Sequence, residues 1–267
     1  MAKIRVLVAG FKGRMGQTTC HMILEHSAEF ELVGGFDPYS DPNQNLSQQL
    51  NLTDGSEIPA FSKIEATLQA KPDVWVDFTT PASVQSNTQF CLEHQISPVI
   101  GTTGLTASEI DALTATAAQQ KLGGLVVPNF ALSAVLMMKF AQEAVKYFPD
   151  VEIIELHHDN KKDAPSGTAL RTAELMAAVR KPKQQGASDE QETLTGARGG
   201  NYEGMRIHSV RLPGLIAHQQ VQFGGVGEGL TIRQDSYDRA SFMTGVALAV
   251  RKVQGLTTLK VGLENVL

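Results

Sequence analysis

Apolar residues over the first 130 positions follow two alternating patterns. Short continuous apolar runs predict buried strands, and apolar positions three or four residues apart predict helices between them. The predicted strands are 3–9, 31–36, 72–78, 97–100 and 125–127. The predicted helices are 17–27, 63–69, 83–94 and 108–120, the last with Ser108 as its N-cap. Regular strand–helix alternation predicts an α/β fold with a parallel sheet covered by helices on both faces.

The second half of the chain has a different pattern. A strand at 151–156 is predicted between helices at 134–147 and 168–179, and a last helix at 239–253. Three segments alternate between apolar and polar residues and are separated by glycine turns, which predicts antiparallel pairing. These segments are 205–212, 216–223 and 230–235. Residues 181–204 are polar and glycine-containing, which predicts a mobile loop.

Composition narrows the class of protein. The 267 residues favour two domains, and the net charge of -5 without a long basic run argues against nucleic acid or anionic membranes as partners. Apolar runs are strand-sized, far short of the ~20 residues of a membrane helix, and no signal peptide is evident. With only Cys20 and Cys91, a disulfide framework is excluded. We therefore expect a cytoplasmic, two-domain globular protein that acts as an enzyme.

A glycine-rich loop joins the first predicted strand to the first helix. Gly10, Gly13 and Gly16 let backbone amides approach a pyrophosphate, and the helix N-terminus adds partial positive charge. The spacing is GxxGxxG rather than GxGxxG, so the motif alone is weak evidence for a dinucleotide-binding loop. Its position directly after a strand strengthens the prediction. Asp37 ends the second strand, where a carboxylate accepts hydrogen bonds from an adenosine ribose. The alternative is that Asp37 only forms the turn before Pro38.

The same residues bear on which nicotinamide cofactor is used. Asp37 disfavours a 2′-phosphate by like-charge repulsion, whereas Lys12 and Arg14 attract it. We therefore expect NADH use, with NADPH use also open.

A second cluster of chemically active residues lies in 153–168. His157 and His158 close a strand and point to opposite faces, so they are poor co-ligands for one metal, and proton transfer suits them better. The helix start at 166–168 is a ready site for a carboxylate, with His158 and Lys161 nearby. The cluster predicts a substrate with more than one carboxylate, against the alternative of a merely polar strand end.

The segment ELHHDNKKDAPSGTA at 155–169 resembles the signature of the bacterial dihydrodipicolinate reductase family, now described as 4-hydroxy-tetrahydrodipicolinate reductases. It matches the pattern Glu-x-His-His-x-x-Lys-x-Asp-Ala-Pro-Ser-Gly-Thr-Ala without a gap. VAGFKGRMG, DFTTP at 77–81, GTTG at 101–104, PNF at 128–130 and the block 218–249 are also similar to that family. The family's usual acid-then-Arg pair is absent because Pro38 follows Asp37, which argues against a strong NADPH preference.

The resemblance implies NAD(P)H-dependent reduction of 4-hydroxy-tetrahydrodipicolinate, via dihydrodipicolinate, to tetrahydrodipicolinate in the diaminopimelate–lysine pathway. Hydride reaches C4 of a conjugated cyclic imine, and charge moves toward the nitrogen and C3. His157 matches the family's proton donor, and Lys161 matches a second acid that assists loss of the 4-hydroxyl as water. The residues that match the substrate carboxylate site are His158, Ser166, Gly167 and Thr168.

The resemblance also implies an architecture. A Rossmann-like dinucleotide-binding domain takes 1–129 plus 240–267, and an α+β domain on a mixed or antiparallel sheet takes 130–239, binds substrate and assembles a homotetramer. No metal, nucleic acid or membrane is implied. The cofactor-binding residues implied are Gly10, Phe11, Lys12, Gly13, Arg14, Met15, Asp37, Gly101, Thr102, Thr103, Val127, Pro128, Asn129 and Phe130.

Two other classes of protein share some of these features. A sugar or inositol dehydrogenase also has a glycine loop and a sheet domain, but typically carries Glu-Lys-Pro where this chain has GTTG and PNF. A non-catalytic nucleotide-binding regulator needs a DNA-reading element, and no basic helical module precedes the first strand. The intact His157 and Lys161 also favour an enzyme.

Overall fold

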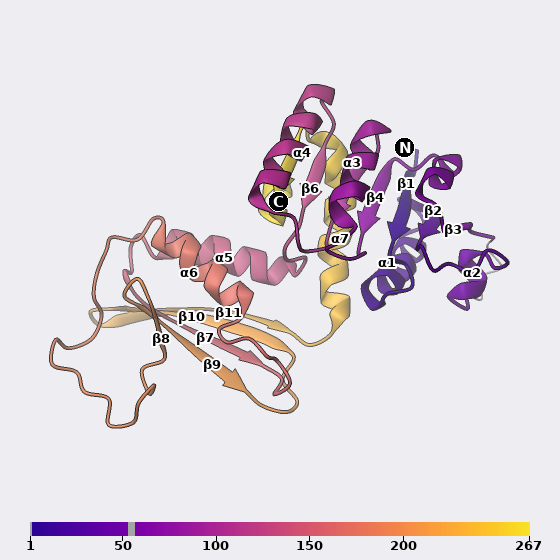
Figure 1. The fold of residues 1–267 in the computed structure, drawn as a ribbon. Helices are drawn as coiled ribbons and strands as arrows, with labels where there is room; N and C mark the ends of the chain where they lie inside the picture. The colour runs from indigo at the N-terminus through magenta and orange to yellow at the C-terminus, as the bar shows by residue number, and fades with distance from the viewer. Residues whose placement is uncertain (1, 53–56) are drawn as a thin grey trace. The chain divides into compact units, whose positions relative to one another are not determined.

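The computed structural model describes residues 2–52 and 57–267 and divides the chain into two compact units (Figure 1). Unit 1 comprises Met1–Phe130 and Phe242–Leu267, and unit 2 comprises Ala131–Ser241. The C-terminal segment thus returns to the unit in which the chain begins.

Unit 1 is built on a seven-stranded sheet in which every neighbouring pair is parallel, in the order β12-β6-β5-β4-β1-β2-β3. The five predicted strands are all present. The two edge strands β3 and β12 were not predicted, because two or three residues are too few for a recognisable apolar run. The strands are β1 (Ile4–Ala9), β2 (Phe30–Phe36), β3 (Ala60–Phe61), β4 (Val74–Asp77), β5 (Ser97–Ile100), β6 (Gly124–Val126) and β12 (Leu259–Val261).

Helices cover both faces of this sheet, as predicted. The connections β1→β2 and β4→β5 run in opposite directions, so right-handed crossovers place α1 and α3 on opposite faces. Helix α7 packs on α1, and α4 packs on α3. The strand order reverses between β1 and β4, where ligands bind in sheets of this kind. The helices are α1 (Arg14–Glu25), α2 (Leu46–Gln49), η1 (Ile64–Ala70), α3 (Val84–Glu93), α4 (Ala107–Gln120), η2 (Arg239–Phe242), α7 (Met243–Lys252), η3 (Val253–Gly255) and η4 (Leu263–Val266).

The N-cap of α4 is Thr106, so the assignment of Ser108 was wrong. The Thr106 hydroxyl accepts the Glu109 amide, and the Glu109 carboxylate accepts the Thr106 amide at 2.7 Å. This reciprocal capping box starts the helix one residue earlier than predicted and places Ser108 inside its first turn.

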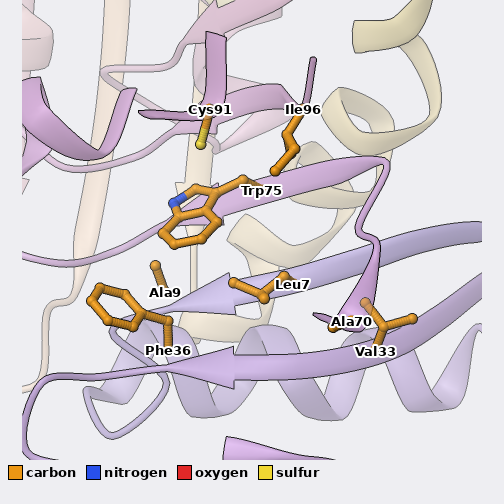
Figure 2. Packing of buried hydrophobic residues seen from close by; sticks show 8 residues of the cluster. All are labelled: Leu7, Ala9, Val33, Phe36, Ala70, Trp75, Cys91 and Ile96. Carbon is orange, nitrogen blue, oxygen red and sulfur yellow. The ribbon is translucent and has the colours of Figure 1, made fainter. Parts of the chain in front are cut away.

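One face of the sheet packs into a hydrophobic cluster around β4 (Figure 2). The fully buried Trp75 ring lies 5.6 Å from the Phe36 ring, centroid to centroid. Leu7 and Ala9 of β1 share this cluster with Cys91, the buried small residue on α3. The continuous apolar runs of β1, β2 and β4 therefore pack in one core, and their carboxyl ends lie side by side in the parallel sheet.

Unit 2 contains a five-stranded mixed sheet in the order β11-β10-β7-β9-β8. Its helices α5 (Leu132–Ala144) and α6 (Gly167–Ala177) pack together, and α5 also contacts β10 and β11. The strands are β7 (Asp150–His157), β8 (Gly200–Tyr202), β9 (Met205–Arg211), β10 (Ala217–Gly225) and β11 (Glu228–Ser236).

The predicted antiparallel pairing of the three alternating segments is only half correct. Strands β10 and β11 form an antiparallel hairpin, but β9 runs parallel to β7, which lies between β9 and β10. The turn at Gly214 therefore joins two strands that are not neighbours. The central position of β7 decides this, because it pairs with β10 on one edge and with β9 on the other.

Residues 181–204, predicted to be a mobile loop, are mostly irregular and contain one unpredicted short strand, β8. Arg180 braces this segment through its guanidinium, which donates to the carbonyls of Pro149, Lys183 and Glu203 at 2.7–3.0 Å. Arg198 lies in the same segment and pairs with Glu152 of β7.

Candidate active site

The end of β7 carries an acid–histidine pair. His157 is the last residue of the strand, and its Nδ1 lies 2.5 Å from Oε2 of Glu155. Glu155 is completely buried, whereas 15% of the His157 side chain is exposed. The Nδ1 atom of the imidazole is thus held by a buried carboxylate, while part of the ring remains exposed.

Glu155 gathers three further contacts. Arg211, at the end of β9, binds both carboxylate oxygens at 2.7 and 2.8 Å, and the backbone N–H of Ser166 donates to Oε1 at 3.1 Å. Burial alone favours the neutral carboxyl group. Hydrogen bonds from His157 and Arg211 outweigh this effect and hold the pKa of Glu155 at about 2.

Helix α6 starts next to this pair. Ser166 is its N-cap and accepts the Ala169 amide, while Gly167 is exposed and Thr168 half-buried. The first amides of a helix attract anions because they have no partner within the helix. The predicted carboxylate site at 166–168 therefore lies at the start of α6, where the Ser166 amide contacts Glu155.

The loop between β7 and α6 carries the other predicted residues. Lys161 donates to the carboxylate of Asp163 at 2.7 Å, which lowers the pKa of that carboxyl group. His158 lies just past the strand and is exposed, and its carbonyl accepts the Lys161 amide. Arg211 also donates to the Asp163 carbonyl at 2.8 Å, so it connects this loop to Glu155.

Glu155 and Arg211 were not identified from the sequence as site residues. Glu155 occupies an inward position of β7, in phase with the buried Val151 and Ile153, and a charged residue in that phase is the signal that could have revealed it. Arg211 carries no such signal. It faces His157 only because β9 pairs in parallel with β7.

In unit 1, the glycine loop is tight enough to require glycine. Gly10 has φ +75°, and a Cβ there would lie 2.4 Å from the Phe78 carbonyl oxygen. A Cβ on Gly16 would lie 2.2 Å from the Gly10 carbonyl oxygen. Gly13 is the N-cap of α1 and offers no side-chain cap, so the helix start is left to backbone amides. This cradle fits a pyrophosphate.

Phe11, in the same loop, is fully buried and packs against Gly35. Its side chain thus belongs to the core, and only its backbone can face a cofactor. Lys12 and Arg14 are exposed, and Met15 is half-buried.

Asp37 and Lys12 meet at Tyr39. The Asp37 carboxylate accepts the Tyr39 amide at 3.0 Å, and the Lys12 ammonium donates to the Tyr39 carbonyl at 2.8 Å. The Asp37 carboxylate therefore stabilises the turn that follows β2, and Asp37 and Lys12 both contact the backbone of Tyr39.

A buried carboxylate connects two of the predicted cofactor-facing loops. Asp77, fully buried at the end of β4, accepts the hydroxyls of Thr79 at 2.6 Å and Thr102 at 2.8 Å. Trp75 and Asn87 donate to its other oxygen. The loops after β4 and β5 are thereby held together.

The remaining predicted cofactor residues follow β5 and β6. Gly101 lies between the rings of Phe78 and Phe130, and a Cβ there would be 2.3 Å from the Phe78 ring. Thr103 and Pro128 are exposed, Asn129 is half-buried, and Val127 is buried. All fourteen predicted cofactor residues thus follow the carboxyl ends of β1, β2, β5 and β6, at one edge of the parallel sheet.

Across residues 2–52 and 57–267, no group of three His, Cys, Asp or Glu side chains is arranged to hold a metal ion. Within the same ranges, no helix has the length and apolarity needed to cross a membrane.

Several known proteins are similar to this chain over its whole length. Family models described as "Dihydrodipicolinate reductase, N-terminus" and "Dihydrodipicolinate reductase, C-terminus" match residues 4–130 and 133–267. The 4-hydroxy-tetrahydrodipicolinate reductase of Enterococcus faecalis is 59% identical over 264 residues, covering 99% of this chain and 100% of that protein. The enzyme of the same name from Lactiplantibacillus plantarum is 56% identical over 266 residues, covering 99% of this chain and 100% of that protein. The solved structure of dipicolinate-bound dihydrodipicolinate reductase from Paenisporosarcina sp. TG-14 is 50% identical, covers both chains completely and superimposes with a TM-score of 0.92.

Proposed function

The chain belongs to the dihydrodipicolinate reductase family, and we propose that its own residues reduce 4-hydroxy-tetrahydrodipicolinate through the site at the end of β7. It is an oxidoreductase of the diaminopimelate–lysine pathway, and the product is tetrahydrodipicolinate. The observation that carries the proposal is the pairing of His157 with the buried Glu155 beside the start of α6. This arrangement offers a proton and an anion site within one unit.

The carboxylate site is assigned to the start of α6. Ser166, Gly167 and Thr168 present backbone amides and hydroxyls to one carboxylate, and His158 adds a polar contact. The Paenisporosarcina relative is described as binding dipicolinate, a cyclic dicarboxylate, which supports the same substrate class for this chain.

The reaction consumes one hydride and one proton after water is lost. Lys161 gives a proton to the leaving 4-hydroxyl, which departs as water while C3, acidified by the neighbouring imine, loses a proton to solvent, so that the new C3=C4 double bond is conjugated with the imine. Lys161 regains its proton from solvent. Bound NAD(P)H supplies the hydride at C4. The displaced electron pair moves through the conjugated bonds, and His157 delivers its Nε2 proton to C3. The imidazolium ends the cycle as neutral imidazole, so charge balances.

Unit 1 is assigned to the cofactor. The cradle at Gly10–Gly16 fits the pyrophosphate, the residues after β5 and β6 line the nicotinamide end, and Asp37 serves the adenosine ribose. We assign NADH as the preferred cofactor, with NADPH accepted through Lys12 and Arg14. We assign unit 2 to substrate binding and to assembly of a homotetramer, and the enzyme to the cytoplasm.

Replacement of His157 tests the proposed proton transfer. His157→Gln should lower kcat by about 10²–10⁴, the range for a positioned general acid, with little change in substrate KM. Initial rates with substrate made in situ by the preceding synthase give both constants.

The matched control is His208→Gln. His208 lies on β9 and also pairs with an acid, Glu152, but is not among the proposed site residues. This variant should keep the wild-type kcat. A His157→Gln enzyme with near-normal kcat would remove His157 from the mechanism.

A further inference from the structure

We propose that Glu155 is a positioning residue, clamped by Arg211, that presents the Nε2 atom of His157 to the substrate. This inference rests on the proposed proton transfer from His157. Glu155 and Arg211 are thereby added to the proposed site, where they act by orienting the imidazole and by holding the start of α6.

The first argument comes from hydrogen-bonding chemistry. An ionised carboxylate only accepts, so the 2.5 Å contact between Glu155 Oε2 and His157 Nδ1 requires the proton on Nδ1. The neutral ring is then the Nδ1–H tautomer. Nε2 is the nitrogen left to carry and deliver the catalytic proton.

The second argument concerns the charge of Glu155. Arg211 binds both oxygens of the carboxylate, which is the fork geometry that stabilises a buried anion. Burial disfavours the anion, but the hydrogen bonds from His157 and Arg211 dominate and set the pKa near 2. Glu155 therefore stays ionised throughout the cycle and does not take the proton from His157.

The third argument is that the same carboxylate fixes the substrate site. The Ser166 amide donates to Glu155 Oε1, and Arg211 donates to the Asp163 carbonyl in the loop that carries Lys161. Glu155 and Arg211 thus set the distance between the proton donor and the helix start that receives the substrate carboxylate. A small misplacement between such groups is costly in rate.

The chain contains a matched control for this arrangement. Glu152 lies on the same strand and contacts His208 at 2.8 Å and Arg198 at 2.7 Å. It thus forms an acid–histidine–arginine group of the same composition. Odd and even positions of β7 face opposite sides of the sheet, so Glu152 points away from the side that Glu155 occupies.

The test compares Glu155→Gln with Glu152→Gln. Glu155→Gln should lower kcat by about 10- to 100-fold, by analogy with the loss of groups that orient metal-binding histidines. The substrate KM and the Kd for dipicolinate, measured by calorimetry, should change by less than about threefold. Glu152→Gln should leave all three quantities unchanged.

A readout independent of turnover is the tautomer of His157. In ¹⁵N NMR spectra of the ligand-free wild-type enzyme, assigned with His157→Gln, the neutral ring should carry its proton on Nδ1. A neutral ring with its proton on Nε2 in the wild type overturns the proposal, and this measurement needs no Glu155 variant to fold. In Glu155→Gln the Nε2–H tautomer should gain population.

A double variant separates the two proposals. Because a glutamine oxygen can still accept the Ser166 amide, the start of α6 keeps its contact, and Glu155→Gln should cause no further loss of kcat in a His157→Gln background. A normal kcat in His157→Gln defeats the proposed proton donor itself. A large loss in His157→Gln with a normal kcat in Glu155→Gln defeats only the positioning role. Equal losses of kcat, dipicolinate affinity and thermal stability in Glu155→Gln assign it a merely structural role.

Discussion

At the scale of single residues, the glycines fall into two kinds. Gly10 and Gly16 are required by the protein itself, because a Cβ at either position would collide with backbone atoms. Gly167 is different. A Cβ added there meets nothing within 4 Å, and its φ is not in the left-handed region. Its glycine therefore has no explanation in packing or backbone strain, but a ligand that approaches the start of α6 would explain it.

Gly167→Ala tests this explanation. The folded protein should gain about 0.4–1 kcal/mol of stability, because alanine fits the backbone at this position and reduces the conformational entropy of the unfolded chain. The new methyl group should obstruct the substrate carboxylate and raise KM and the Kd for dipicolinate by about tenfold or more, as expected for about 1.4 kcal/mol of lost binding. Thermal unfolding and calorimetry measure the two effects.

Gly224→Ala is the matched control, because Gly224 also lies in unit 2 and has open space around its Cβ direction. That variant should bind dipicolinate normally. Unchanged dipicolinate affinity in Gly167→Ala would place the substrate carboxylate elsewhere.

At the scale of elements, prediction from sequence succeeded where one local pattern decides the structure. Continuous apolar runs gave the five inner strands of the parallel sheet, and the glycine loop and the 155–169 signature gave the candidate site. Prediction failed where pairing between strands that are far apart in the sequence decides the structure. The two short edge strands depend on neighbours for their hydrogen bonds, and the parallel direction of β9 depends on β7.

The site shows the same limit. His157, Lys161 and Gly167 lie within one continuous segment, so a local pattern reveals them. Arg211 lies 56 residues after Glu155, and only the register of β7 with β9 brings the two together. No spacing along the chain encodes that contact. The residues that position the reacting groups are therefore harder to predict than the groups themselves.

The end of β2 makes a specific prediction about cofactor choice. Asp37→Asn keeps an oxygen that can accept the Tyr39 amide, so the turn survives, but it removes the negative charge. KM should rise for NADH and fall for NADPH, which shifts the preference by about 1–3 kcal/mol, or roughly 5- to 150-fold. Initial rates with each cofactor measure this shift, and kcat should hold.

Lys12→Ala should act in the opposite direction and weaken NADPH with little effect on NADH, because it removes the ammonium next to Tyr39. If Asp37→Asn instead leaves both KM values unchanged, Asp37 serves only the turn, and charge at this position does not select the cofactor.

At the scale of the whole molecule, the chain leaves unit 1 after Phe130 and returns at Phe242. These two points are close, because a Cβ on Gly245 would lie 2.0 Å from the Phe130 carbonyl oxygen. Phe242 is about one helical turn, or roughly 5 Å, before Gly245. All of the proposed cofactor residues belong to unit 1. The returning segment supplies α7, which packs on α1 and β1, and the edge strand β12.

Unit 1 should therefore fold and bind its cofactor without unit 2. Replacing residues 131–241 by a linker of about four glycine and serine residues should give a cooperatively unfolding protein that binds NADH within about tenfold of the full chain and has no reductase activity. Residues 1–130 alone should not fold, because they lack the buried Val246, Val250, Leu259 and Leu263. At roughly 1.5–3 kcal/mol per buried side chain, that loss approaches the whole stability of a domain. Circular dichroism, thermal unfolding and NADH fluorescence titration of both proteins decide the matter. A linked unit 1 that folds but does not bind NADH would show that cofactor binding needs residues of unit 2, and the assignment of the cofactor site to unit 1 alone would be wrong.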